Sequence, residues 1–357
     1  MFPIERSSRC EVCHLFPADV VKCFEFDSKQ SPGGPSTAYY LRRGSRRAAT
    51  NYYIYLLFFC RTLITSLNYF MKVSFFLFTL SALFFCNKKS SSGGANVNTL
   101  LFDTLPTVKL VTPASIREAS GIAASKSIPN HLWVHEDSGT PTQLFLIGHD
   151  GKIVKTVFLN GIVNRDWEDM AIAGSDIYLA DIGNNNNNYP DCTIYQFMEP
   201  SATTDTVKAF TSIRFKYEDG AHDAEALLVD PQSKDIFIIT KKENPSAIYK
   251  IAYPYSTSAV NSAVLAGKLA YSGAVGAALS PDGKEIIIKT YTGLNYYTRN
   301  AGESIDAALQ RTSKTLGYVM EIQGEAVTFA ANNSGFFTLS ETGPLNFPVN
   351  LYFYGRK

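Results

Sequence analysis

Cysteine is scarce in the part of this 357-residue chain that follows residue 86. Only Cys192 lies there, so this part cannot form an internal disulfide and must gain its stability from packing. We expect Cys192 to act as a small buried hydrophobic side chain. An excess of either charge is also lacking, because 33 Lys and Arg residues stand against 32 Asp and Glu residues. This balance, together with the lack of any RNA-binding or DNA-binding motif, excludes nucleic acid from the expected partners.

Motifs of several enzyme classes are missing as well. The sequence has no Gly-x-Ser-x-Gly nucleophile motif, no phosphate-cradling glycine loop and no His-Glu-x-x-His metal helix. Residues 10–14, CEVCH, have the spacing of a haem-attachment motif, and Cys23 could add a thiolate for zinc. Haem attachment requires an export signal ahead of the motif, and none precedes Cys10. A zinc site would require a second pair of ligands, and none accompanies these cysteines. Neither site is therefore expected.

An export signal is present further along, in residues 71–94, MKVSFFLFTLSALFFCNKKSSSGG. A short positive segment, an apolar run over 73–85 and a Cys followed by a polar spacer are the order of parts in a bacterial lipoprotein signal. Residues 83–86, LFFC, resemble a lipobox, with Phe85 in place of the usual small residue. We expect lipidation of Cys86 and export to the periplasmic or outer side of a bacterial membrane.

This interpretation divides the chain into four parts. The alternative is an uncleaved transmembrane helix, for which residues 52–59 add a second apolar run. The run over 73–85 is by itself shorter than the roughly 20 residues that a spanning helix needs. The expected parts are an upstream extension foreign to the natural protein or disordered over 1–70, a signal peptide over 71–86, a flexible tether over 87–104 and a folded domain over 105–357.

From about residue 105 the composition changes to short runs rich in Val, Ile, Phe, Tyr and Thr, separated by Gly, Pro, Asp and Asn. One phrase recurs there at steps of about 50 residues, the range of one four-stranded propeller blade. Its five occurrences are REASGIAAS from Arg117, DWEDMAIAG from Asp166, DAEALLVDP from Asp223, VGAALSPDG from Val275 and QGEAVTFAA from Gln323.

The repeat predicts an all-β domain, a β-propeller of five four-stranded blades, with a six-bladed ring or a β-sandwich as alternatives. The fifth unit runs out of chain after three strands. Residues 107–113, TVKLVTP, are expected to supply its outer strand, so that the two ends of the domain pair and no sheet edge stays exposed.

The first strand of each propeller blade lines the central channel, so the residue that begins it lies at the channel mouth. Taking Glu118, Glu168, Glu225, Gly276 and Glu325 as equivalent, we expect four glutamates to converge there. The second strand of each blade returns to the same face and ends with further polar residues. These are His135, Asp137, Asp181, Asn184, Lys241, Lys242, Lys289, Tyr291 and Glu341.

Converging carboxylates raise one another's pKa values unless a cation or basic side chains compensate their charge. Calcium is the expected cation, because it takes oxygen ligands in irregular geometry and the repeats supply no cluster of His or Cys. The alternative is that single carboxylates pair with backbone N–H groups, Lys241 or Arg165. Trp167 is assigned either to packing between blades or to stacking on a ligand. The predicted metal ligands are Glu118, Glu168, Asp223, Glu225 and Glu325.

Residues 105–357 resemble bacterial secreted propeller lipoproteins of unassigned function, in which the phrases EASG, DWED, DIGNN and DAEA occur in this order. The arrangement is more distantly similar to calcium-activated nucleotidases, five-bladed propellers whose channel acids hold calcium. It is similar also to β-propeller phytases, in which calcium and lysine side chains grip phosphate. The resemblance implies a calcium site at the mouth, although Gly276 and Ala277 offer no side-chain oxygen in the fourth unit.

Two functions follow as hypotheses. The first is a monomeric, lipid-anchored propeller that binds calcium and a small or polymeric polar ligand outside the membrane. The second is a calcium-dependent hydrolase of phosphate esters, with Asp166 or Asp169 activating water and Lys241 or Lys289 neutralising the phosphate. A two-carboxylate glycosidase is a third alternative. The missing nucleophile motifs favour binding and leave open whether the protein is an enzyme. The residues assigned to the ligand are Trp167, His135, Asp137, Asp181, Asn184, Tyr291 and Glu341.

Overall fold

The computed structural model of this protein describes residues 11–13, 23–25 and 100–357. Strands β1 (Glu11–Cys13) and β2 (Cys23–Glu25) pair with each other in antiparallel fashion. The predicted signal peptide over 71–86, with Cys86, lies outside the described residues. Residues 97–357 form one compact unit, whose described part is treated below.

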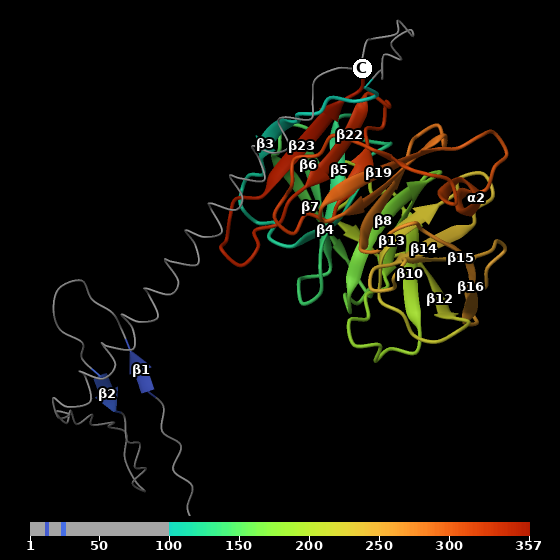
Figure 1. Cartoon of the computed structure of the whole chain (residues 1–357), viewed down its shortest axis with the longest axis horizontal. Coiled ribbons are helices and arrows are strands. Elements are labelled where there is room, and N and C mark those ends of the chain that lie inside the picture. Colours follow the sequence, from blue (N-terminus) through green and yellow to red (C-terminus); the bar gives the residue numbers. More distant parts are fainter. Residues whose placement is uncertain (1–10, 14–22, 26–99) are drawn as a thin grey trace, which may run out of the picture. The chain divides into compact units, whose positions relative to one another are not determined.

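The strands of this unit form antiparallel sets of four, each running outward from a short inner strand (Figure 1). The first set is β4 (Ala119–Ala124), β5 (His131–Glu136), β6 (Gln143–Gly148) and β7 (Ile153–Leu159). The second is β8 (Trp167–Ala173), β9 (Asp176–Asp181), β10 (Cys192–Met198) and β12 (Thr211–Tyr217). The third is β13 (Ala224–Val229), β14 (Ile236–Thr240), β15 (Ala247–Ile251) and β16 (Asn261–Lys268).

Two further sets complete the arrangement within residues 100–357. The fourth is β17 (Ala274–Leu279), β18 (Glu285–Thr290), β19 (Gly293–Thr298) and β20 (Lys314–Thr315). The fifth is β21 (Val327–Phe329), β22 (Gly335–Leu339), β23 (Asn350–Gly355) and β3 (Thr107–Leu110). Outside these sets, β11 (Thr206–Val207) pairs in parallel with β7, and α2 (Ile305–Leu309) follows β19.

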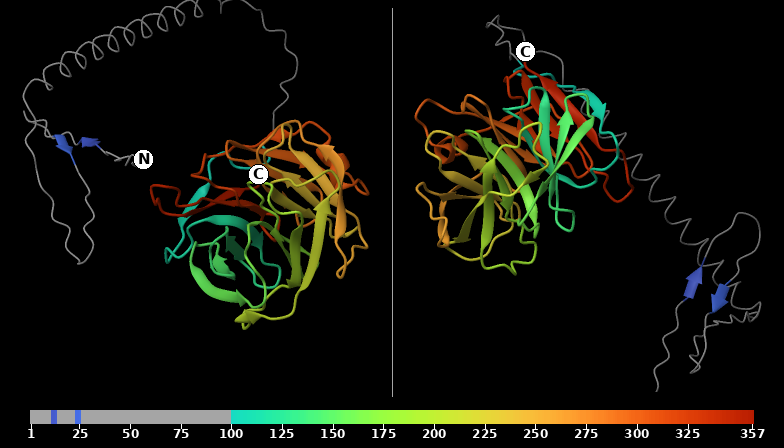
Figure 2. Two further views of the ribbon diagram at one scale, coloured as in Figure 1. Left: turned by 90° about the horizontal axis from the view of Figure 1, so that it is seen from below. Right: turned by 180° about the vertical axis from the view of Figure 1, so that it is seen from behind.

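The inner strands β4, β8, β13, β17 and β21 make a ring, since each contacts the inner strands on both of its sides (Figure 2). Residues of all these strands line one narrow cavity of about 70 Å³. Sheets of four antiparallel strands arranged radially around a shared channel are the architecture of a β-propeller. The predicted fold class, an all-β propeller, is confirmed.

The hydrophobic core lies between the blades. Each buried apolar cluster of the described residues combines side chains of two neighbouring sheets, for example Ile213 with Leu227 and Val134 with Phe337. A blade is therefore covered on both faces, and its middle strands need apolar residues at successive positions rather than at alternate ones. Strand β14, IFIIT, is buried along its whole length for this reason.

The ring closes between the two ends of the described unit. Strand β3 pairs antiparallel with β23, with Thr107 opposite Phe353 and Leu110 opposite Asn350. This confirms the prediction that the segment from Thr107 supplies the outer strand of the last set. The folded part begins earlier than the predicted tether boundary at residue 104, because Phe102 is buried in the core between the fourth and fifth sheets.

Both ends of the unit lie on the same face of the ring. Phe102 pairs with Arg356 in an isolated antiparallel β-bridge. The backbone N–H of Arg356 donates to the carbonyl of Ser334, which lies in the hairpin turn between β21 and β22. Inner strands begin on the opposite face, where β5, β9 and β14 end. We call that opposite face the mouth.

Outer strands β12 and β16 connect two neighbouring sheets. They pair in parallel, with Phe215 opposite Asn261 and Tyr217 opposite Ala263. The second and third sets thereby form one hydrogen-bonded sheet of eight strands. Among the described residues there is no helix of the length and apolar character needed to traverse a bilayer.

Candidate functional site

Four of the five inner strands, β4, β8, β13 and β17, carry a β-bulge at their start, and the bulge fixes which side chain faces the mouth. The pairing of β8 with β9 skips Glu168, and that of β13 with β14 skips Glu225. The same skip falls on Ser120 in β4 and on Val275 in β17. Glu325 stands two residues before Val327, which places it at the corresponding point of the fifth set.

This register corrects two of the predicted equivalences. Ser120, and not Glu118, occupies the first place, and Val275, and not Gly276, occupies the fourth. Glu118 is exposed, and its carbonyl accepts the Asp137 N–H at 2.9 Å. A bulge is defined by its pairing partner, which the local sequence does not reveal. The starts of the inner strands thus present three glutamates at the mouth rather than four.

Glu168, Glu225 and Glu325 form what we call the inner triad. One carboxylate oxygen from each lies within 4.8 Å of the others, and all three residues are buried. Ser120 Oγ lies 2.7 Å from the Glu168 carbonyl oxygen and 3.2 Å from Glu325 Oε2. The structure thus brings together three of the four glutamates that were expected at the mouth, without Glu118.

Lys241 and Tyr291 neutralise one side of the inner triad. Lys241 Nζ forms an ion pair with Glu225 Oε1, donates to Tyr291 Oη at 3.1 Å, and lies 3.9 Å from Glu325 Oε1. Tyr291 Oη in turn donates to Glu325 Oε1 at 2.5 Å. One ammonium group therefore stands against three carboxylates.

The rest of the inner triad lacks donors. Glu225 Oε2 is buried and has no hydrogen-bond partner. Among the described residues, no donor contacts the side-chain oxygens of Glu168, which is only 3% exposed. Buried carboxylate oxygens without partners are costly, so this side of the triad is suited to a cation.

Electrostatics at the mouth follow from this shortage of positive charge. Burial, and after it the Glu225 and Asp137 carboxylates, raises the pKa of Glu168 well above its usual range. Burial and the neighbouring Glu325 raise the pKa of Glu225 to about 8 against the opposing effect of Lys241. Burial and Glu325 likewise raise the pKa of Glu341 to about 9. At neutral pH the negative charge of these carboxylates must be compensated by bound protons or by a metal ion.

A second cluster, the outer triad, shares Glu168 and adds Asp137 and Asp166, again with one oxygen from each within 4.8 Å of the others. A Cβ at Gly183 would lie 2.0 Å from Glu168 Oε1 and 2.5 Å from Asp166 Oδ2. The two carboxylates therefore converge on a space that only glycine leaves open. Burial and Asp137 raise the pKa of Asp166.

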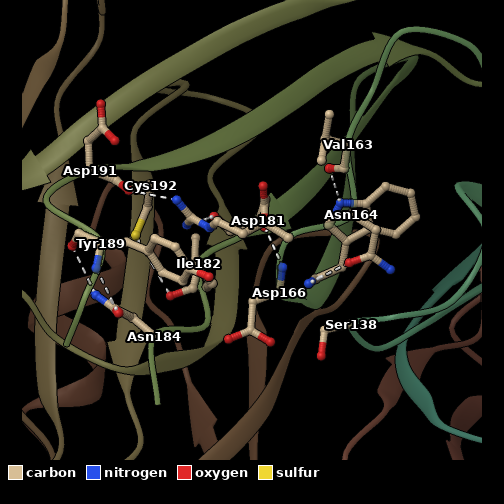
Figure 3. A network of polar contacts seen from close by, with 12 residues as sticks. Ser138, Val163, Asn164, Asp166, Asp181, Ile182, Asn184, Tyr189, Asp191 and Cys192 are labelled. Atoms are coloured by element: carbon tan, nitrogen blue, oxygen red, sulfur yellow. Dashed lines mark hydrogen bonds and ion pairs between the residues drawn. The ribbon is translucent and has the colours of Figure 1, made fainter. Parts of the chain in front are cut away.

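The loop network beside the outer triad holds Asp166 in place (Figure 3). Asp181 Oδ1 accepts the Asp166 N–H at 2.8 Å, and Arg165 donates to the carbonyls of Asp181 and Asp191. Burial raises the pKa of Asp181 to about 6. Figure 3 shows the Asp166 carboxylate pointing away from Asp181, on the side where Ser138 lies. Asp181 thus positions the backbone and stands outside both triads.

Asn184 and Asp223 also support the mouth rather than line the triads. Asn184 exchanges hydrogen bonds with the Tyr189 backbone at 3.0 and 3.1 Å, which closes the asparagine-rich loop. Asp223 accepts the Asn184 N–H at 2.8 Å and pairs with Lys242 Nζ at 2.9 Å. The predicted metal ligand Asp223 therefore has a hydrogen bond on Oδ1 and an ion pair with Lys242 on Oδ2, although Oδ2 makes no hydrogen bond.

Two predicted ligand-contacting residues belong to the core. Trp167 is fully buried, and its Nε1 donates to the Val163 carbonyl at 3.0 Å. His135 is also fully buried and packs edge-on against Trp167. Burial lowers the pKa of His135 to about 4, so its ring is neutral. Neither ring has a free face at the mouth, and the packing alternative for Trp167 is the one observed.

Two predicted catalytic residues are likewise enclosed. Asp169 accepts backbone N–H groups of Met170 and Leu227 at 2.8 Å and of Ala277 at 3.2 Å, so it links three inner strands. Lys289 is fully buried in an ion pair with Glu321. Neither side chain can reach a ligand at the mouth.

Sequence reasoning missed three contributors to the site. Ser120 was missed because the predicted register was shifted from the true one. Gly183 was missed because it was interpreted as part of a loop sequence. Glu321, the partner of Lys289, lies outside the repeated phrase altogether. The signal for Gly183 was present, because a glycine close to the end of a buried strand can mark a close approach of other atoms to the backbone.

No protein-family model and no curated protein matches the chain. Among solved structures it is similar to the PQQ-bound form of aldose sugar dehydrogenase from Streptomyces coelicolor, with 9% identity and a TM-score of 0.41, covering 72% of this chain and 100% of that chain. It is also similar to a chain of a nidogen/laminin complex, with 11% identity and a TM-score of 0.39, covering 63% and 73%. Both likenesses are too remote to bear on the site, and the propeller rests on the strand pairing described above.

Proposed function

We propose that this propeller binds a hard divalent cation, Ca²⁺, at the inner triad and holds a polar ligand over the bound ion. The observation that carries the proposal is Glu225 Oε2, a buried carboxylate oxygen without a hydrogen-bond partner, on a residue that forms one cluster with Glu168 and Glu325. A cation would satisfy this oxygen and relieve the mutual repulsion of the three carboxylates.

The donor set fits calcium better than a transition metal. All ligand atoms of both triads are carboxylate oxygens, and His135 faces the core. Oxygen-only sites favour Ca²⁺ or Mg²⁺, and Ca²⁺ accepts the irregular geometry and the additional water ligands that a site of three carboxylates requires. The chemistry supplied by such an ion is charge compensation and attraction of anionic or hydroxyl-rich ligands.

The ligand is expected on the outer triad, because Asp137 and Asp166 are only half-buried. Tyr291 and Glu341 border the same mouth and can donate or accept hydrogen bonds there. These groups suit a small or polymeric ligand with several hydroxyl or carboxylate oxygens. Its identity is left to the ligand assay.

The cellular setting is proposed from sequence. The segment over 71–86 and Cys86 support export and lipid anchoring to a bacterial membrane, with residues 87–99 as the link to the propeller. We propose a monomer. The resemblance to secreted propeller lipoproteins supports the same setting.

The test is calcium-dependent stabilisation of the full chain. A ligand at 100 times its Kd adds about 2.7 kcal/mol, which raises Tm by about 5–10 °C in a domain of this size. Glu225→Gln should abolish most of this rise and weaken calcium binding at least about tenfold in titration calorimetry. Glu118→Gln removes the same charge from the same face outside both triads and should keep the response.

An unchanged Tm and no heat of binding in wild-type protein, after removal of bound metal by a chelator, would overturn the proposal. An equal calcium response in wild-type and Glu225→Gln protein would place the ion elsewhere. Magnesium at the same concentration serves as the competing cation.

The hydrolase hypothesis gains no specific support. Of its four assigned residues, Asp169 and Lys289 are enclosed, and Lys241 is engaged by the inner triad. Only Asp166 stays available at the mouth. A panel of nucleotides and phytate with calcium should therefore release no phosphate, and release that depends on Asp166 would reinstate the enzyme.

A further inference from the structure

We infer that Lys241 is a resident counter-ion of the inner triad, which a divalent cation must displace, so that this side chain sets the affinity of the site. The inference rests on the proposed calcium function and extends it to regulation of the same site. It starts from the contacts of Lys241 Nζ with Glu225, Glu325 and Tyr291.

The Lys241 ammonium group lies beside the space that the metal ion would need. Its closest contact is Glu225 Oε1, the other oxygen of the carboxylate whose Oε2 lacks a partner. Glu325 Oε1, 3.9 Å away, is held by Tyr291 Oη, which Lys241 also contacts. A divalent ion shared by these glutamates would lie next to a like charge, and that repulsion opposes binding.

The side chain of Lys241 can change its conformation while hydrogen bonds hold its backbone in place. Lys241 follows the last residue of β14, and its N–H donates to the Asp223 carbonyl at 3.0 Å. Its carbonyl accepts the Gly273 N–H at 3.1 Å. The side chain is 24% exposed, so the flexible four-carbon stem can carry the ammonium group into solvent. Lys289, with 0% exposure, has no such route.

A neighbouring lysine provides a matched control. Lys242 pairs with Asp223 Oδ2 at 2.9 Å and with the Asn185 backbone and side chain, and its side chain is 47% exposed. Asp223 belongs to neither triad. Lys242→Met thus removes the same charge one residue away without touching the inner triad.

The experiment is calcium titration of the full chain with a charge series at residue 241. Lys241→Met and Lys241→Gln should bind Ca²⁺ at least about tenfold more tightly than wild-type protein, and Lys241→Arg more weakly. Lys242→Met should stay within about threefold of wild type. Lys241→Gln keeps a polar group near Tyr291 and serves if Lys241→Met does not fold.

A second readout separates displacement from a merely structural role. Without calcium, the Lys241 variants leave three carboxylates uncompensated, so their Tm in chelator should fall below that of wild type. With saturating calcium the difference should vanish or reverse. A purely structural lysine would lower Tm equally in both conditions.

Each outcome has a defined meaning. Calcium binding by wild type, with equal or weaker binding by Lys241→Met and Lys241→Gln, would overturn the role of Lys241 and leave the calcium site standing. Binding by the variants but barely by wild type would support it strongly. No binding by any of these proteins would overturn the calcium proposal itself.

Discussion

Glu168 belongs to both carboxylate triads, and its place depends on the absence of a side chain at residue 183. The Cα of Gly183 borders the oxygens of Glu168 and Asp166 so closely that even a methyl group would overlap them. The glycine is therefore a determinant of the acidic mouth, although it contributes no ligand atom.

Gly183→Ala should displace both carboxylates and reduce the calcium-induced rise in Tm by at least half. Forcing an extra methyl group into a packed site costs typically about 1–3 kcal/mol, so Tm in chelator should also fall. Gly293→Ala is the control, because a Cβ there meets no atom within 4 Å. An unaltered calcium response in Gly183→Ala would show that the two carboxylates do not need this space.

Glu341 makes the mouth sensitive to pH. Its pKa is about 9 in the folded protein, against 4.5 for an ordinary glutamate. Between these values the folded state binds more protons than the unfolded state, so stability falls as pH rises through this window. In chelator, the Tm of the Glu341→Gln variant should therefore fall less between pH 6 and pH 9 than the Tm of wild-type protein.

The fall in Tm between the two pH values should differ between the two proteins by at least about 2 °C. A free-energy difference of about 1 kcal/mol changes the Tm of a domain of this size by at least that much. Thermal denaturation followed by circular dichroism at fixed ionic strength measures it. Parallel pH profiles for the two proteins would contradict the assignment. Saturating calcium should flatten the wild-type profile, because the ion compensates the same charges.

At the scale of single elements, the bulge explains both the success and the errors of sequence reasoning. The phrase that begins each inner strand predicts Glu168, Glu225 and Glu325 at the mouth, because a polar residue before an apolar run stands out. The bulge then breaks strict alternation, so Glu168 faces the mouth while its neighbour Asp169 turns into the channel to accept backbone N–H groups.

The second strands show the limit of alternation in the same way. Lys241 and Lys289 look equivalent in sequence, yet Lys241 lies past the end of β14 and Lys289 lies within β18. Inside the strand, Lys289 follows three buried isoleucines, is itself fully buried and needs its own partner, Glu321. Which lysine reaches the mouth depends on strand length, which the repeat does not encode.

The parallel pairing of β12 with β16 should be visible in hydrogen exchange. Outer strands of a propeller are ordinarily edges with unpaired amides, but these two are bonded to each other. Amides that donate across this seam should exchange at least about tenfold more slowly than those of Lys314 and Thr315 in the short exposed strand β20. Equal exchange on both edges would show that the seam opens freely.

At the scale of the whole molecule, the propeller was predictable because the repeat recurs at the length of one four-stranded blade. The segment from Thr107 was identified as the last outer strand because the final unit lacked one. Phe102 was not identified from the sequence, because it lies in the segment assigned to the tether, outside the repeat. Its burial becomes apparent only when the fourth and fifth sheets lie side by side.

Phe102→Ala should destabilise the entire ring, because the phenyl group packs against Tyr296 of the fourth sheet and Phe329 and Phe336 of the fifth. Truncation of a buried Phe costs about 3–5 kcal/mol. Urea denaturation should show this loss in one cooperative transition, whereas Leu105→Ala, at a side chain 76% exposed, should change little. A separate early transition for the last sheet would contradict joint closure.

Because the chain enters the ring at Phe102 and leaves it at Arg356 on the face behind the carboxylates, any attachment made through either end holds the molecule from the rear. Whether the support is an acyl chain, a resin or a fused protein, the carboxylates of the two triads then lie on the face opposite the point of attachment. A ligand that binds at the mouth, as proposed, would then reach it without first passing between the ring and its support.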